Sequence, residues 1–234
     1  MRRLILGTDM SIRAILAASV LVSGFSSAAM AVPLPFTSPP FTQTALPGTT
    51  LDARPELAGI VLEDRLTPYL VTSGGQQASG SILARVVRET ASGTLDFYWQ
   101  VRGDEMGASP VTIFRVDGFT TYVSDGDWRI DSSGNEGPET AYNFGTGAVN
   151  FGFDRGIASD DYSYLFFLRT SATSYAETGR YDIITGAGFS GLFSTFAPST
   201  TVPEPAQWAL MLGGLALVGG IARRRRAGST ALYA

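Results

Sequence analysis

The sequence predicts an all-β domain over residues 56–197, an antiparallel β-sandwich or a jelly-roll-like fold. Three observations predict this class. Short apolar runs alternate with clusters of Gly, Ser, Asp and Thr, which is typical of strands joined by turns. No segment between residues 56 and 197 repeats its apolar residues with the 3.6-residue period of a helix. The chain has no Cys, so a hydrophobic core has to stabilise the fold without disulfides.

Six segments carry the strand pattern, at residues 81–88, 93–102, 111–116, 121–123, 148–153 and 162–169. In the second of these, apolar and polar side chains alternate as in a half-buried strand. The apolar face consists of Leu95, Phe97, Trp99 and Val101. The opposite face consists of Asp96, Tyr98, Gln100 and Arg102. The apolar face needs a second layer to cover it, so we expect Phe97 and Trp99 to be buried between two sheets.

Residues 1–31 have the layout of a secretory signal peptide. Arg2, Arg3 and Arg13 precede an apolar stretch at residues 14–22. Small residues follow, and Ala29 and Ala31 form the expected cleavage signal, with the cut after Ala31. Translation from either Met1 or Met10 would preserve this layout.

Residues 32–55 predict a proline-rich linker. They contain six of the twelve prolines of the chain. Such a composition disfavours helix and sheet, so we expect an extended or disordered segment that connects the signal peptide to the β domain.

Residues 198–234 carry three features in a fixed order. Val-Pro-Glu-Pro at residues 202–205 is followed by an uncharged apolar run at residues 207–222. With its flanks the run supplies about 17–20 helical residues, enough to span a bilayer. A basic cluster then stops the chain on the cytoplasmic side. It consists of Arg223, Arg224, Arg225 and Arg226.

This order resembles the PEP-CTERM tail of exported bacterial proteins. The resemblance implies that Pro203, Glu204 and Pro205 are read by a sorting protease of the inner membrane, of the exosortase type, which removes the helix and the basic cluster. It implies a membrane-anchored precursor that faces the periplasm, followed by release to the cell surface or the extracellular matrix. Residues 93–101, 151–153 and 165–175 also resemble the β-rich extracellular domains common in such proteins, which have no assigned activity.

The composition excludes most catalytic classes. The chain has no His, no Cys and no Lys, because all 17 basic residues are Arg. A Ser-His-Asp triad, His-ligated metals, a thiolate nucleophile, a Schiff base and a P-loop lysine are therefore excluded. Residues 32–202 hold 10 Arg against 19 Asp and Glu, a formal charge of −9. This acidic balance disfavours nucleic acid and anionic lipid as partners.

One acidic segment is a candidate calcium site, formed by Asp125, Asp127 and Asp131. The first two stand at positions one and three of an EF-hand-type loop, and Glu136 stands at position twelve. Arg129 and the following Ile occupy positions five and six, where an oxygen ligand and Gly belong. A less regular calcium site and an acidic surface loop without metal remain as alternatives.

Tyr98 and Trp128 are candidates for an aromatic platform that stacks on sugar rings. Tyr98 is favoured because it falls on the face opposite Trp99.

The leading functional interpretation is a non-enzymatic envelope or extracellular-matrix protein, associated with exopolysaccharide as the family resemblance implies. A carbohydrate-binding module is one alternative. A glycoside hydrolase that uses two carboxyl groups is the other, drawing on acidic pairs such as Asp160 and Asp161.

Overall fold

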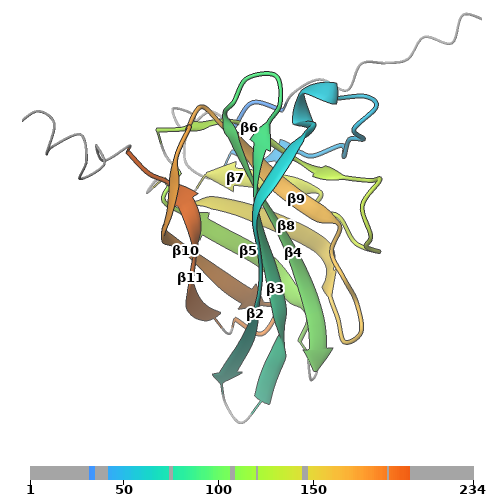
Figure 1. Ribbon diagram of the computed structural model, residues 1–234. Helices are drawn as coiled ribbons and strands as arrows, with labels where there is room; N and C mark the ends of the chain where they lie inside the picture. The colour runs from blue at the N-terminus through green and yellow to red at the C-terminus, as the bar shows by residue number, and fades with distance from the viewer. Residues whose placement is uncertain are drawn as a thin grey trace, which may run out of the picture.

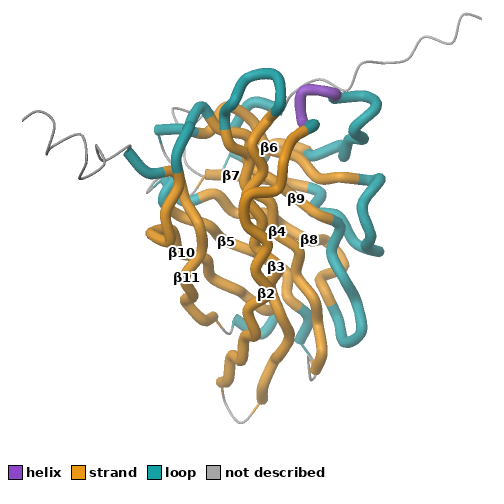
Figure 2. Tube along the Cα trace, in the orientation of Figure 1, coloured by secondary structure: helices purple, strands orange, loops and turns teal. Residues whose placement is uncertain are grey.

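A computed structural model describes residues 32–34, 42–73, 76–105, 109–119, 121–143, 147–188 and 190–200. These residues form eleven strands and one short 3-10 helix. Figure 1 shows the strands arranged in layers, and Figure 2 shows that strand predominates in the described chain. The predicted all-β class is therefore confirmed.

The strands form two antiparallel sheets. In sheet A the order is β2 (Gly59–Ser73), β3 (Gln76–Glu89), β4 (Leu95–Glu105), β9 (Leu165–Thr170) and β6 (Val123–Arg129). In sheet B the order is β1 (Thr44–Ala45), β7 (Thr140–Asn143), β8 (Val149–Ile157), β5 (Val111–Asp117), β10 (Tyr175–Thr185) and β11 (Ser190–Pro198). The strand pattern had indicated parts of β3, β4, β5, β6, β8 and β9. It had not singled out β2, β7, β10 or β11.

One hydrophobic core fills the space between the two sheets. Trp99 of β4 lies at its centre, with its ring 5.7 Å from that of Phe114 on β5. Its indole Nε1 donates a hydrogen bond of 3.1 Å to Thr195 Oγ1 on β11. Trp99 thus joins the sheets through both packing and a buried hydrogen bond. The predicted burial of Phe97 and Trp99 is confirmed.

The outer face of β4 differs from its prediction. The pattern indicated a half-buried strand, yet Asp96, Tyr98 and Gln100 are buried as well. Residues 49–58, which include the 3-10 helix η1 (Pro55–Leu57; purple in Figure 2), cover this face. Leu51 and Leu57 pack there in a small apolar cluster with Tyr98. Both faces of β4 are therefore shielded from solvent.

The covering segment belongs to the region expected to be a linker. Its backbone joins sheet A, since the Thr49 amide donates to the Trp128 carbonyl at 2.8 Å and the Ile130 amide donates to the Thr49 carbonyl at 2.9 Å. Strand β1 pairs with β7 of sheet B. The folded domain thus begins before residue 56, because a proline-rich sequence can pack in extended form as well as link.

The predicted signal peptide, the cleavage residues Ala29 and Ala31, and the tail from residue 201 onward lie outside the described residues. No helix within the described part of the chain is long and apolar enough to cross a membrane.

Candidate functional site

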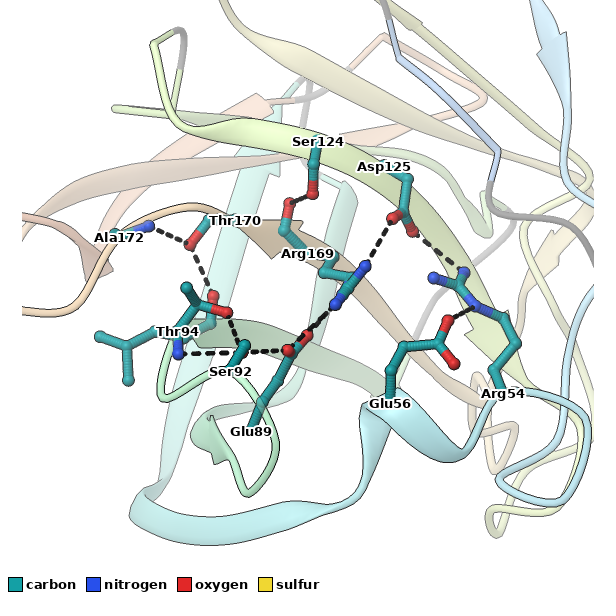
Figure 3. Close-up of polar contacts among 11 residues, drawn as sticks. Arg54, Glu56, Glu89, Ser92, Thr94, Ser124, Asp125, Arg169, Thr170 and Ala172 are labelled. Atoms are coloured by element: carbon teal, nitrogen blue, oxygen red, sulfur yellow. Dashed lines mark hydrogen bonds and ion pairs between the residues drawn. The ribbon is translucent and has the colours of Figure 1, made fainter.

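A row of charged side chains crosses the outer face of sheet A. The strand register places Asp96 of β4 opposite Arg169 of β9, and Arg169 opposite Asp125 of β6. Side chains of paired residues on adjacent strands lie on the same face and within reach of one another. Figure 3 shows Arg169 and Asp125 of this row together with the side chains of Glu89, Arg54 and Glu56, which approach them from other segments.

Arg169 connects two carboxylates of this row. Its guanidinium donates two hydrogen bonds to Glu89 at the end of β3, the one from Nη2 measuring 3.0 Å. Its Nη1 lies 3.9 Å from Asp125 Oδ2. Burial opposes ionisation of Glu89, but the hydrogen bonds from Arg169 and Ser92 outweigh it and lower the pKa of this carboxyl. Glu89 is therefore an anion that is held by the guanidinium.

Arg54 enters the network from the covering segment. Its Nη1 donates a 3.0 Å hydrogen bond to Asp125 Oδ1, and its Nε donates a 2.9 Å bond to Glu56 Oε1. The guanidinium also lies over the ring of Phe167, 5.7 Å from its centroid. Burial opposes its charge, but the bonds to Asp125 and Glu56 outweigh this and raise the pKa of Arg54. The Arg54–Asp125 pair thus ties residues 49–58 to the sheet.

Asp96 is the exception in this network. Its side chain is fully buried, at 0% exposure, and neither carboxylate oxygen has a hydrogen-bond partner. Burial, together with the negative charge of Glu89, raises the pKa of Asp96 to about 8. A carboxyl in this state is protonated at neutral pH, because ionising it without a partner inside the protein is costly. Asp96 is therefore a neutral acid beside the Glu89 carboxylate.

A pocket of about 170 Å³ lies beside the network on the same face. Its walls are largely apolar, with Arg85 and Arg129 among the lining residues. The hydroxyl of Tyr98, which also lines it, has no hydrogen-bond partner. Arg85 bonds to Asp64 and Arg129 bonds to Asp131, so both guanidinium groups are already paired with carboxylates. The apolar lining side chains are Leu51, Leu57, Val61, Val87 and Leu165.

The three acids of the candidate calcium site have separate partners. Asp125 faces Arg54 and Arg169. Asp127 Oδ1 accepts from the backbone amides of Gly48 and Trp128, and burial raises its pKa to about 6 despite these bonds. Asp131 bonds to the Arg129 guanidinium and the Leu51 amide. Within the described residues, no three acidic side chains gather as a group that could hold a metal ion.

The aromatic platform is not formed as expected. Tyr98 is 3% exposed, because the covering segment packs on it and its ring lies 5.1 Å from that of Phe167. The expectation of an exposed Tyr98 is wrong for this reason. Trp128 is partly buried, donates its indole N–H to the Leu46 carbonyl and packs 5.0 Å from the ring of Tyr164. The two candidates therefore do not form one open face.

The outer face of sheet B carries a polar row that the sequence analysis missed. The register aligns Tyr142, Asn150, Arg115, Asp182 and Leu192 across five strands. Arg115 Nε donates a 2.8 Å hydrogen bond to Asn150 Oδ1, and its Nη1 lies 3.9 Å from Asp182 Oδ2. A pocket of about 240 Å³ includes Arg115 and Asp182 in its lining. Only strand pairing reveals this row, because its members are far apart in sequence.

The comparisons with known proteins concern the tail. The family described as the PEP-CTERM protein-sorting motif matches residues 201–226. No curated protein and no solved structure matches the chain. The matched residues include Pro203, Glu204 and Pro205 as well as the four arginines at residues 223–226. The resemblance inferred from the tail is confirmed, and the chain is a protein that carries a PEP-CTERM sorting motif.

Proposed function

We propose that the chain is a non-catalytic exported protein, anchored in the inner membrane by its tail and then released by a sorting protease to the cell surface or the extracellular matrix. Its described residues form a β-sandwich that is the exported cargo. The match of the sorting motif to residues 201–226 carries this proposal. Glu204 and its flanking prolines are the recognition element, and the apolar run at residues 207–222 is the anchor.

The junction between domain and tail supports this order of events. Strand β11 ends at Pro198, five residues before Pro203. The motif therefore follows the last strand directly, and its two prolines favour an extended backbone that a protease can bind. The buried acids of the domain support a non-catalytic role, since Glu89 and Asp125 are engaged with arginines beneath the covering segment.

Intact-mass analysis of the secreted protein tests the proposal. We expect a species that begins near Val32 and ends between Pro203 and Pro205. Glu204→Ala should leave the precursor in the inner membrane, whereas Ser199→Ala, outside the motif, should be processed normally. Secretion of a form that retains the four arginines would contradict the proposal.

Glycan binding on the outer face of sheet B is a second candidate function. The pocket there combines Arg donors with Asp acceptors, and the hydroxyl groups of a sugar need both. Leu192 beside this pocket and Tyr142 in the same row supply apolar surface next to the polar groups. This arrangement suits a neutral or mildly charged polysaccharide.

A glycan array probed with the secreted protein tests this candidate. Arg115→Ala should abolish binding of the protein to the array, whereas Arg85→Ala should leave this binding unchanged. The two arginine side chains have similar exposure, 29% and 27%, and each faces an Asp, but they lie on different sheets. Equal loss in both variants would contradict a site on sheet B. Hydrolysis of any arrayed glycan would overturn the non-catalytic assignment.

A further inference from the structure

Exposed apolar side chains concentrate on strand β2. Among the described residues eight large hydrophobic side chains are exposed, and five of these belong to β2. The five are Ile60, Val61, Leu62, Leu66 and Leu70. β2 is an edge strand of sheet A, so one side of it has no neighbouring strand in that sheet. Exposed apolar side chains concentrated on one strand are typical of a contact with a partner or a membrane.

Pairing with the edge strand of a second molecule is disfavoured. Pro68 lacks a backbone N–H, and the register of β2 shifts between Val61 and Glu63. The charged run Glu63, Asp64 and Arg65 lies within the same strand. Proline, bulges and charges are the devices by which natural edge strands resist pairing with other chains. The apolar side chains of β2 therefore need a partner that does not require backbone pairing.

The first part of β2 lies near the point where the tail leaves the domain. Ile60 stands opposite Arg88, whose Nη2 donates to the Thr173 carbonyl at 3.3 Å. The next residue, Ser174, donates from Oγ to the Ser199 carbonyl at 2.8 Å. The described chain ends one residue later, at residue 200. In Figure 1 the start of β2 and the end of β11 both lie in the upper half of the domain.

The tether to the membrane is short. Six residues lie between residue 200 and residue 207, where the apolar run of the tail begins. A fully extended chain of this length spans at most about 25 Å. While the tail is anchored, this end of the domain is therefore held next to the bilayer surface.

The charged side chains around β2 form pairs of opposite sign, whereas the domain as a whole has an excess of acidic residues. Arg65 pairs with Glu177 at 2.8 Å, and Arg85 pairs with Asp64 at 2.7 Å. The guanidinium of Arg88 donates to the Gly93 and Thr173 carbonyls, so its positive charge is not paired with a carboxylate in these two bonds. This charge offsets that of Glu63, which accepts from Tyr175. The repulsion from anionic lipid expected of the acidic domain is thus reduced at this end.

We infer that Ile60, Val61 and Leu62 form a lipid-contacting patch, which rests on the periplasmic surface of the inner membrane while the tail anchors the precursor. The apolar side chains enter the interface between headgroups and acyl chains, and Arg88 faces the lipid phosphates. The contact orients the domain and keeps the stretch before Pro203 at the depth of a membrane protease. Release of the tail ends the contact, because three side chains alone bind a membrane weakly. This inference rests on the proposed function of the tail.

The chain has no Cys, so single-cysteine labels test the patch without background. Ile60→Cys and Leu192→Cys form a matched pair, since these apolar side chains are 66% and 63% exposed. Leu192 lies six residues before the end of β11, about 20 Å along the strand. Each full-length variant is labelled with a polarity-sensitive fluorophore. It is then reconstituted in vesicles of phosphatidylethanolamine and phosphatidylglycerol, with or without lipids that carry a headgroup quencher.

We expect a blue-shifted emission and a several-fold quenching at position 60, and neither effect at position 192. Arg88→Gln in the Ile60→Cys background should reduce the quenching. Equal aqueous emission at both positions would overturn the inference, and so would label-to-label energy transfer that identifies a second copy as the partner. Flotation of the vesicles separates the two claims. If the protein floats with the vesicles but the label at position 60 emits as in water, only the lipid-contacting patch is refuted. If the protein does not float, membrane anchoring by the tail is refuted as well.

Discussion

The two faces of strand β4 are both buried, but by different means. The inner face packs Leu95, Phe97 and Trp99 against the opposite sheet in the main hydrophobic core. The outer face places Asp96 and Tyr98 beneath residues 49–58. Both ion pairs and a small apolar cluster bury this face.

The comparison shows what each kind of burial depends on. Apolar packing is non-directional, and the inner face is covered by several strands of sheet B. Around Tyr98 the outer face is covered by one segment, and the buried pair Arg54–Asp125 ties that segment to the sheet at 3.0 Å. Removing one partner of such a pair leaves an uncompensated buried charge. The outer face should therefore be the easier one to open.

The largest effect is expected on the inner face. Trp99→Ala should destabilise the domain by about 3–5 kcal/mol, because it leaves a cavity between the sheets. Chemical denaturation of the purified protein measures this loss. Trp99→Phe is the control, since it keeps a ring but leaves Thr195 without its 3.1 Å hydrogen bond, and it should cost less. A Trp99→Ala protein as stable as the parent would refute a shared core.

On the outer face, Arg54→Ala should cost about 3 kcal/mol, because Asp125 loses its closest cationic partner. Adding Asp125→Asn should recover part of the loss, since no buried charge is then left unpaired. Hydrogen exchange sharpens the comparison. The amides of Thr49 and Ile130, which join the covering segment to β6, should exchange faster in Arg54→Ala, while those of Phe97 and Trp99 change little. Uniform acceleration would mean that the two faces open together.

Asp96→Asn should make the domain less sensitive to pH. The pKa of Asp96 is raised to about 8 in the folded protein. At low pH the folded and unfolded states both bind the proton, so Asp96 does not lower the free energy of unfolding there. Stability is lost as the pH rises from about 4 toward 8, by up to about 1.4 kcal/mol per pH unit. Asn mimics the protonated form.

The two proteins should therefore have similar stability near pH 4. The Asn variant should be the more stable one near pH 7, with a difference that grows by up to about 1.4 kcal/mol per pH unit. Urea denaturation at several pH values provides the measurement. Asp127, whose pKa is raised to about 6, is present in both proteins, so its contribution cancels in the difference. A constant difference between the variants from pH 4 to pH 7 would show that Asp96 does not titrate in this range.

The smallest effect is expected for Tyr98→Phe. The Tyr98 hydroxyl is buried and makes no close hydrogen bond, although the Arg129 guanidinium lies nearby, so its removal should change the free energy of unfolding by less than about 1 kcal/mol. Tyr98→Ala is the contrasting variant, because it also removes the ring that packs on Phe167. A large loss on replacement by Phe would show that the hydroxyl has a polar partner in solution.

Local patterns predicted much of this molecule. Alternation in residues 95–101 identified β4 and its core face, because period-two spacing follows from strand geometry alone. The tail was recognised from the order of its motif, apolar run and arginines. In contrast, β2 was missed, because Ile60, Val61 and Leu62 are consecutive, and Pro68 also weakens its strand pattern.

The candidate sites were harder to predict. The charged row on sheet A joins Asp96, Arg169 and Asp125, which are distant in sequence and meet only through strand register. Tyr98 was expected to be exposed because its polar neighbours suggested a solvent face. No local pattern indicates that residues 49–58 fold back over it. Leu51 and Leu57 pack on Tyr98, which lies more than forty residues further along the chain.

The sequence by itself determined the all-β class, the core face of β4, the acidic balance without His, Cys or Lys, and the sorting motif at residues 201–226. These properties depend on composition and on spacing between near neighbours. The tertiary structure decided which carboxyls are ionised, which face of sheet A is covered and where the apolar edge of β2 lies relative to the tail. Those properties depend on desolvation and on long-range contacts, and both arise only when distant segments pack together.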